Sequence, residues 1–278
     1  MTLQRGDRPG FRASRMAPCM ALVLGVCLLM MACGHAGRLT QAAPDLRTAS
    51  DQGDLERRAR IRLELASAYF AQGRLETSLD ELKQALTLYP DLADALSLRG
   101  LVYAGLQQFA LAEDSFDRAL RLAPHDPYIL HNQGWFLCQR GRHDAAQGAF
   151  DRALAQPLYP EATKSWLAKG VCQSMAGQSD AAVRTLTWAF DRDPASPVTA
   201  FNLAAVLADQ GRDEQAARYI RLLNQQPNWV NAQSLWLGAR IESRLGRSEA
   251  AADLISQLRR QFPLAPESRA SLRGAADE

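Results

Sequence analysis

Five cysteines and four histidines are the side chains of this sequence with the widest range of chemistry. Cys19, Cys27 and Cys33 lie in or directly after an apolar run near the start of the chain, whereas Cys138 and Cys172 lie far from it. A thiol can be acylated, oxidised to a disulfide or used as a metal ligand, and its surroundings decide which of these happens. The residues around each group of cysteines therefore indicate which chemistry that group has.

The first group of cysteines follows a basic leader with four arginines and one aspartate. An uncharged run from about Met16 to Ala32 comes next, rich in Leu, Val and Met, and small and polar residues follow Cys33. This order is typical of a secretory signal peptide. The apolar part has about 17 residues, which is the lower limit for crossing a bilayer. An uncleaved membrane anchor and a cleaved signal without lipid are the two alternatives.

The end of the apolar run resembles a bacterial lipoprotein signal, in which a small residue stands directly before the acylated cysteine. Ala32 before Cys33 meets this requirement, whereas Cys27 and Cys19 follow a valine and a proline. The resemblance implies that residues 1–32 are removed and that Cys33 carries acyl chains such as palmitate. Several chains anchor a protein stably because each buried methylene contributes about 0.8 kcal/mol. The residue after Cys33 is Gly34 and not an aspartate, which in lipoproteins of this type resembles an outer-membrane sorting signal.

Loss of the leader changes the charge of the chain. The full sequence has 32 basic and 30 acidic residues, and removing four Arg and one Asp leaves 28 and 29. The remaining protein has no basic surplus to attract nucleic acid. Residues 33–58 are polar, contain Ala and Gly and show no sustained hydrophobic period, so we expect a lipid-attached tether there.

The rest of the sequence repeats with a period of 34 residues, which is typical of tetratricopeptide helix-turn-helix units. We therefore predict an all-α fold, a right-handed superhelical solenoid of six such repeats. Its units span residues 59–92, 93–126, 127–160, 163–196, 197–230 and 232–265, and the segment "QPLYPEA" interrupts the spacing between the third and fourth. Residues 266–278 form a polar C-terminal tail that we expect to fray.

Three kinds of residue recur at fixed places in the units. Small residues in the first helix allow close approach of the second helix; they are Ala66, Gly100, Gly134, Gly170, Ala204 and Ala239. Large apolar residues in the second helix fill the space between units; they are Leu82, Phe116, Phe150, Leu186, Ile220 and Ile255. Glycines end the first helix in a left-handed conformation; they are Gly73, Gly141, Gly177, Gly211 and Gly246.

The first helices of such a solenoid line its concave face. In the first four units, mainly apolar residues occupy the positions expected to point into the groove, and a partner segment would bury them. The predicted partner-binding groove contains Leu63, Phe70, Leu101, Tyr128, His131, Asn132, Trp135, Leu167 and Val171. In unit six the corresponding Gln233, Trp236, Arg240 and Ser243 are more polar. Packing between neighbouring first helices is the alternative for each of these side chains.

The second group of cysteines lies late in the first helices of consecutive units. Cys138 and Cys172 are 34 residues apart, one repeat period, so they occupy neighbouring helices. Disulfides persist in an oxidising compartment, and a bridge needs Cα atoms about 4.4–6.8 Å apart. We predict a Cys138–Cys172 disulfide across the "QPLYPEA" junction. Two buried free thiols are the alternative, because cysteine also serves as a small apolar residue.

No arrangement of residues in the sequence indicates catalysis. It has no GxGxxG, Walker, GxSxG or HExxH pattern. His131 and Cys138 are seven residues apart and His143 follows in the next turn, which is not a familiar zinc spacing. We therefore predict a protein that is not an enzyme, with no metal site, no cofactor and no small-molecule substrate.

Several segments resemble the type IV pilus biogenesis and stability lipoproteins, the PilF/PilW pilotin family. They are "HNQGWFLCQRGRHDAAQGAFDRAL", "LYPEA", "NAQSLWLGARIESRLGR" and "LRRQFPLAPES", and the resemblance covers residues 59–268. It implies a lipid-anchored outer-membrane protein that faces the periplasm and helps the pilus secretin, the ring pore through which the pilus exits, to assemble. The secretin would be its protein partner.

Two other functions remain open from the residues alone. The chain fits a periplasmic scaffold of another envelope assembly, such as a cell-wall enzyme complex or a different secretion system. It also fits an accessory domain of an enzyme whose chemistry lies on another chain.

Overall fold

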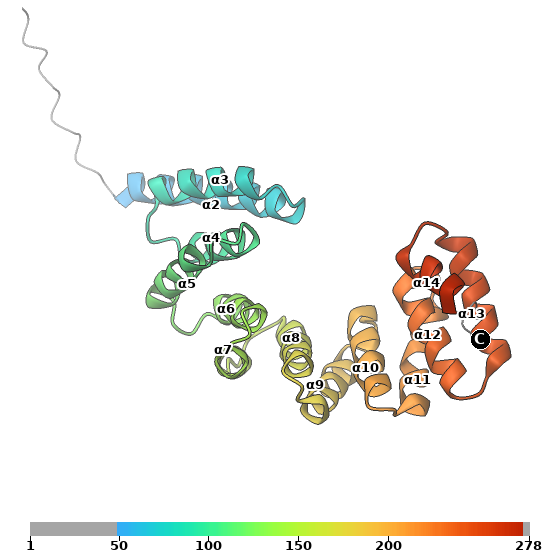
Figure 1. Cartoon of the computed structure of the whole chain (residues 1–278). Helices are drawn as coiled ribbons and strands as arrows, with labels where there is room; N and C mark the ends of the chain where they lie inside the picture. The colour runs from blue at the N-terminus through green and yellow to red at the C-terminus, as the bar shows by residue number, and fades with distance from the viewer. Residues whose placement is uncertain (1–48, 275–278) are drawn as a thin grey trace, which may run out of the picture. The chain divides into compact units, whose positions relative to one another are not determined.

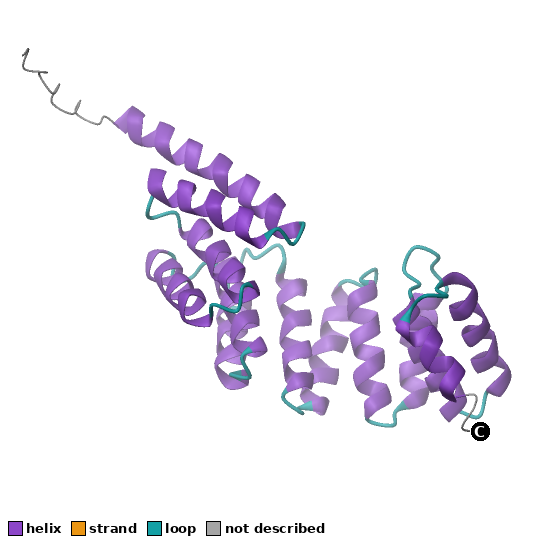
Figure 2. Cartoon of the chain, turned by 45° about the horizontal axis from the view of Figure 1, so that its top comes forward, coloured by secondary structure: helices purple, strands orange, loops and turns teal. Residues whose placement is uncertain are grey.

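The computed structural model describes residues 49–274, which form thirteen helices. The helices are α2 (Ala49–Ala71), α3 (Leu75–Leu88), α4 (Ala93–Gly105), α5 (Phe109–Leu122), α6 (Pro127–Gln139), α7 (His143–Leu154), α8 (Ala162–Met175), α9 (Ser179–Arg192), α10 (Pro197–Asp209), α11 (Asp213–Asn224), α12 (Ala232–Arg244), α13 (Ser248–Gln261) and α14 (Pro266–Gly274). Over this range there is no strand, and none of the helices combines the length and the apolar character needed to cross a membrane (Figure 2). The predicted signal peptide, Cys33 and the tether up to residue 48 lie outside the described residues.

The helices form six antiparallel pairs, from α2/α3 to α12/α13, that stack in chain order (Figure 1). The second helix of each pair contacts the first helix of the next pair, and each first helix also contacts the first helix of the following pair. Within residues 49–274, consecutive second helices make no such contact. The first helices therefore lie on the inner side of the stack. This arrangement is the all-α tetratricopeptide solenoid that the 34-residue period predicts.

Each pair is held together by a small residue facing a large one. A Cβ atom added to Gly134 would lie only 2.9 Å from the Phe150 ring, and one added to Gly100 would lie 2.7 Å from the Phe116 ring. Real Cβ atoms do not approach other atoms so closely, so only glycine allows this helix separation. Both phenylalanines are completely buried. The large residues of the first five pairs are at most 1% exposed, as their pattern predicts, whereas Ile255 of the sixth pair is half-buried and lines a hollow with Ala239.

The turns inside five of the pairs depend on glycine. Gly73, Gly141, Gly177, Gly211 and Gly246 all have φ between 70° and 73°. Glycine adopts this left-handed conformation without steric cost, whereas other residues do not. In the second pair the position is occupied by Gln107, whose φ is 60°. This turn therefore carries local strain that the other five avoid.

The sequence prediction was wrong at both ends of the solenoid. Helix α2 begins at Ala49, so residues 49–58 of the predicted tether are helical. Asp54 and Arg57 of this segment are exposed and form an ion pair of 2.7 Å. A polar composition indicates that a segment is exposed to solvent, but an exposed segment can still be helical.

At the other end, residues 266–274 form α14, which packs against α12 and α13. The serines of this helix are small enough to be buried while their hydroxyls find backbone partners. The Ser268 hydroxyl donates to the carbonyl of Phe262 over 2.7 Å, and the Ser271 hydroxyl donates to the carbonyl of Ser268 over 2.8 Å. The predicted fraying is therefore wrong for this part of the tail.

Cys138 on α6 and Cys172 on α8 are joined by a disulfide, with their Cα atoms 5.7 Å apart. Both residues are completely buried, beside Phe136 and Phe150. The bond links the third and fourth helix pairs across the seven-residue connection 155–161, in which Tyr159 is buried and Leu158 is exposed. A kink in the stacking at this connection stays a prediction.

Replacing Gln107 by glycine should stabilise the solenoid by about 1 kcal/mol, because glycine removes the left-handed strain in the second turn. The midpoint of urea unfolding measures this change. Gly141→Gln is the matched control, and it should destabilise the protein by a similar amount. An unchanged or lower midpoint for Gln107→Gly would contradict the strain argument.

Reducing the Cys138–Cys172 bond should lower the free energy of unfolding by roughly 3–4 kcal/mol, since it closes a loop of 34 residues. Peptide mass analysis should first show that neither cysteine reacts with a thiol label in denaturant without reductant. Labelling of both residues under these conditions would mean that the bond is absent from the isolated protein.

Candidate partner-binding groove

The predicted groove residues lie on α2, α4, α6 and α8, the first helices of four consecutive pairs. None of the nine is fully buried, and Tyr128, 44% exposed, is the most accessible. The other eight are half-buried. Because the backbones of these helices are in contact, their side chains form one continuous inner surface. This surface has the intermediate exposure that a binding groove needs.

Helix α6 lies at the centre of this surface, and its start is well defined. The Asp126 carboxylate accepts hydrogen bonds from the backbone nitrogens of Tyr128, at 2.9 Å, and Ile129, at 3.1 Å. Pro127 occupies the first turn, where its missing N–H costs nothing. This N-terminal cap fixes where the helix begins and therefore which of its residues face the neighbouring first helices.

Two polar groove residues on α6 bind neighbouring helices. His131 Nδ1 lies 2.8 Å from Ser165 Oγ on α8, and Asn132 Nδ2 donates to Ser97 Oγ on α4 over 3.1 Å. Burial lowers the pKa of His131, so its imidazole is neutral at neutral pH. These two side chains hold α6 between its neighbours, which is the packing role that the sequence left open for them.

In a catalytic site, a serine hydroxyl this close to a histidine could act as a nucleophile with the histidine as its base. Ser165, however, is completely buried and also hydrogen-bonds Tyr159 Oη over 3.0 Å. A substrate cannot reach a hydroxyl that has no exposed surface. The pair therefore contributes to the packing of the third and fourth helix pairs.

Four of the apolar groove residues pack against the core with one part of the side chain and expose another part. Trp135 and Leu101 pack against the core formed by α5 to α8, while Leu63 and Phe70 pack against the core formed by α2, α3 and α4. Each of them keeps part of its surface accessible. An apolar side chain that is supported from behind and accessible in front can bind a partner without moving much.

Near the C-terminal end, Trp236, Arg240 and Ser243 line a hollow of about 550 Å³. Residues of α13 and Ser271 of α14 complete its wall. The sequence predicted the α12 residues of this lining but not the α14 residue, because α14 itself was not predicted.

A second hollow, of about 630 Å³, was missed from the sequence. It lies between α2 and α3, where Ile61 and Leu65 are 52% and 41% exposed and Arg58, Arg62 and Lys83 supply positive charge. The four-residue spacing of Ile61 and Leu65 was the available signal. They lie on a different side of α2 from Leu63, so they are not part of the predicted groove.

Among the described residues, the buried carboxylate of Glu242 lies away from the groove. Arg221 donates two hydrogen bonds to Glu242, at 2.6 and 2.8 Å, and Arg247 donates a third at 3.3 Å. Hydrogen bonding to Arg221 lowers the pKa of Glu242, which stays ionised. The group joins α11 and α12 and is a structural ion pair network.

Family models of the tetratricopeptide repeat match most of the described helices. A "TPR repeat" model matches residues 66–107, and "Tetratricopeptide repeat" models match residues 93–126, 132–177 and 175–227. These matches agree with the helix pairs of the structure.

Matches to single relatives cover nearly the whole solenoid. The type IV pilus assembly protein PilF of Pseudomonas aeruginosa is 25% identical over 236 residues, which are 85% of this chain and 92% of that protein. A solved structure of Pseudomonas aeruginosa PilF superposes with a TM-score of 0.68 at 24% identity, over 80% of this chain and 99% of that one. The crystal structure of PilW, described as a widely conserved type IV pilus biogenesis factor, superposes with a TM-score of 0.71 at 30% identity, over 77% of this chain and 98% of that one. The chain therefore belongs to the tetratricopeptide-repeat family of type IV pilus biogenesis factors that includes PilF and PilW.

Proposed function

We propose that this protein is a pilotin, a non-catalytic lipoprotein of the outer membrane that helps the type IV pilus secretin to assemble. Lipid on Cys33 holds it at the membrane, facing the periplasm, and the inner surface of the solenoid binds a segment of the secretin. Membership of the PilF/PilW family supports the coarser role in pilus assembly. The anchor, the membrane and the secretin are parts of the proposal.

The observation that carries this proposal is the partly exposed row of apolar side chains on four consecutive first helices. Apolar surface of this extent is expected to be covered by another protein segment. The row supports binding of a peptide segment, because four first helices that contact one another in order each contribute apolar side chains to the inner surface. Hydrogen bonds from His131 and Asn132 hold the central helix, so little ordering is needed when a partner binds.

The same groove would also serve a scaffold of another envelope assembly. Purification of the protein from detergent-solubilised outer membranes distinguishes the two. Recovery of the secretin supports the proposal. Recovery of cell-wall enzymes or of another secretion system without the secretin would contradict the proposal and support a scaffold of another envelope assembly. Turnover by the purified protein itself would contradict a non-catalytic role.

Replacing Cys33 by Ser should release the protein from the outer-membrane fraction, because the acyl chains would be lost. The helix pairs should remain folded, since Cys33 precedes α2. Membrane fractionation and circular dichroism measure the two effects. Cys27→Ser is the matched control and should stay in the membrane, and retention of Cys33→Ser there would remove Cys33 as the anchor.

Replacing Trp135 by Ala should weaken secretin binding by about 1–3 kcal/mol if the indole is a binding anchor. If its main role is packing, the change should instead cost about 3–5 kcal/mol of stability. Thermal unfolding and the binding constant of the same variant separate the two effects. Trp188→Ala on α9, a second helix, is the control and should leave binding unchanged; an unchanged constant for Trp135→Ala would exclude Trp135 from the site.

A further inference from the structure

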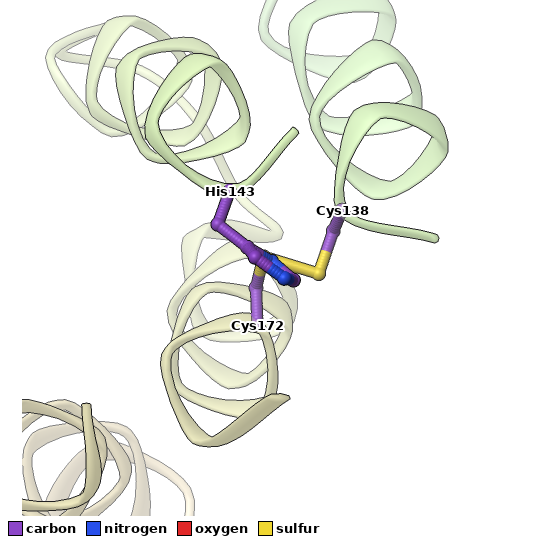
Figure 3. A group of neighbouring side chains, drawn as sticks. All are labelled: Cys138, His143 and Cys172. Atoms are coloured by element: carbon purple, nitrogen blue, oxygen red, sulfur yellow. A yellow bond between two sulfur atoms is a disulfide. The ribbon is translucent and has the colours of Figure 1, made fainter. Parts of the chain in front are cut away.

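Three metal-binding side chains meet where α6, α7 and α8 come together. They are Cys138, His143 and Cys172, and their ligand atoms all lie within 4.8 Å of one another. Figure 3 shows the imidazole of His143 directed at the two sulfur atoms. Both cysteines are completely buried, whereas His143 is half-buried at the first turn of α7. The sulfurs are therefore shielded, and the histidine side offers a route of entry.

The local fold brings His143 to this place. Gly141, with a φ of 71°, reverses the chain between α6 and α7, and its N–H donates to the carbonyl of Cys138 over 2.9 Å. His143 then begins α7 only five residues after Cys138. A disulfide does not require an imidazole beside it, so the presence of His143 calls for a separate explanation.

The distance between His143 and Cys172 fits a metal centre. Nδ1 lies 3.6 Å from Cys172 Sγ. In a tetrahedral zinc site with Zn–S of about 2.3 Å and Zn–N of about 2.1 Å, the nitrogen and sulfur ligands are about 3.6 Å apart. Two sulfur ligands are about 3.8 Å apart by the same geometry. The disulfide holds its sulfurs closer than this, so the site can form only after the bond is broken.

Reduction would provide the missing separation. A dithiol reductant transfers two electrons to the Cys138–Cys172 bond, becomes a disulfide itself and leaves two protein thiols. The two sulfurs then move apart to van der Waals distance. A divalent cation binds them as thiolates, with release of two protons, and binds the neutral imidazole of His143.

We infer that the reduced protein binds one Zn²⁺ through Cys138, Cys172 and His143, with water in the fourth position. The metal-bound and disulfide forms exclude each other, because the same two sulfurs serve both. From the sequence, no metal site was expected, and His131 was the histidine placed seven residues from Cys138. His131 instead bonds Ser165, and the residue that reaches the sulfurs is His143.

A fourth soft group provides a control. The Met175 thioether lies 3.9 Å from Cys138 Sγ, and its side chain is largely exposed. Thioethers are poor ligands for zinc, which prefers thiolate and imidazole. Met175→Leu should therefore leave zinc affinity unchanged, whereas His143→Ala should weaken it by more than about tenfold.

The test uses the full chain in detergent with Cys19, Cys27 and Cys33 replaced by Ser, so that Cys138 and Cys172 are its two remaining thiols. The chain is reduced with a phosphine, and Zn²⁺ is titrated in competition with a chromophoric chelator. The reduced chain should bind one Zn²⁺ and the oxidised chain none. Co²⁺ in place of Zn²⁺ should give the near-ultraviolet charge-transfer absorption of thiolate ligands, which His143→Ala should weaken.

Circular dichroism measures the helix content of each sample and shows whether a reduced chain that binds no Zn²⁺ is still folded. If reduction lowers the helix content and Zn²⁺ restores it, the site is supported, because metal binding is then coupled to folding. The inference is overturned if reduced, helical protein binds no Zn²⁺, if His143→Ala binds it as tightly, if Met175→Leu loses as much affinity as His143→Ala, or if Zn²⁺ fails to restore a chain unfolded by reduction.

Discussion

The contact between a small residue on one helix and a large residue on its partner is the constraint on which this solenoid depends. At Gly134 and Phe150 no side chain larger than hydrogen fits, so the two helices approach closely and the ring fills the space behind them. Such a pair cannot bury its apolar surface alone, and the neighbouring pair completes the core. Stacking in this way puts all first helices on the inner side. The exposed parts of their side chains form the groove as a direct result.

The middle of the solenoid has a covalent bond between first helices in addition to polar bonds of the kind that also occur at its ends, where Arg60 pairs with Asp94 and Arg244 donates to the carbonyl of Ala208. Around α6, the Cys138–Cys172 disulfide and the polar bonds of His131 and Asn132 all join consecutive first helices. These bonds oppose sliding between the pairs at the irregular connection, where the chain is longer than the repeat requires. A groove held in one shape loses little entropy on binding, so more of the contact energy appears as affinity. The bonds between first helices are thus as relevant to partner binding as the apolar surface.

Much of this architecture could be predicted from the sequence because each repeat imposes the same physical requirements. The 34-residue period, the small and large positions and the turn glycines all follow from close packing of two short helices, and neighbouring helices made the pairing of Cys138 with Cys172 a reasonable expectation. The errors fall where that repetition ends. Residues 49–58 and α14 belong to no repeat, so their helices depend on local propensity and on tertiary contacts of Ser268 and Ser271. The approach of His143 to the sulfurs was not predicted either, because it depends on the angle between three helices and not on spacing along the chain.

The groove and the sulfur cluster share one helix, and this links the two proposals physically. Trp135 and Cys138 are three residues apart on α6, so they lie on neighbouring parts of its surface. Whatever bond the Cys138 sulfur makes, to Cys172 or to a metal, acts on the same helix turn that supports the indole. Breaking that bond without replacing it would remove the covalent link between α6 and α8 and leave the hydrogen bond between His131 and Ser165 and the weak sulfur contact between Cys138 and Met175. The indole that we propose as a binding anchor therefore lies beside the bond that links α6 to α8.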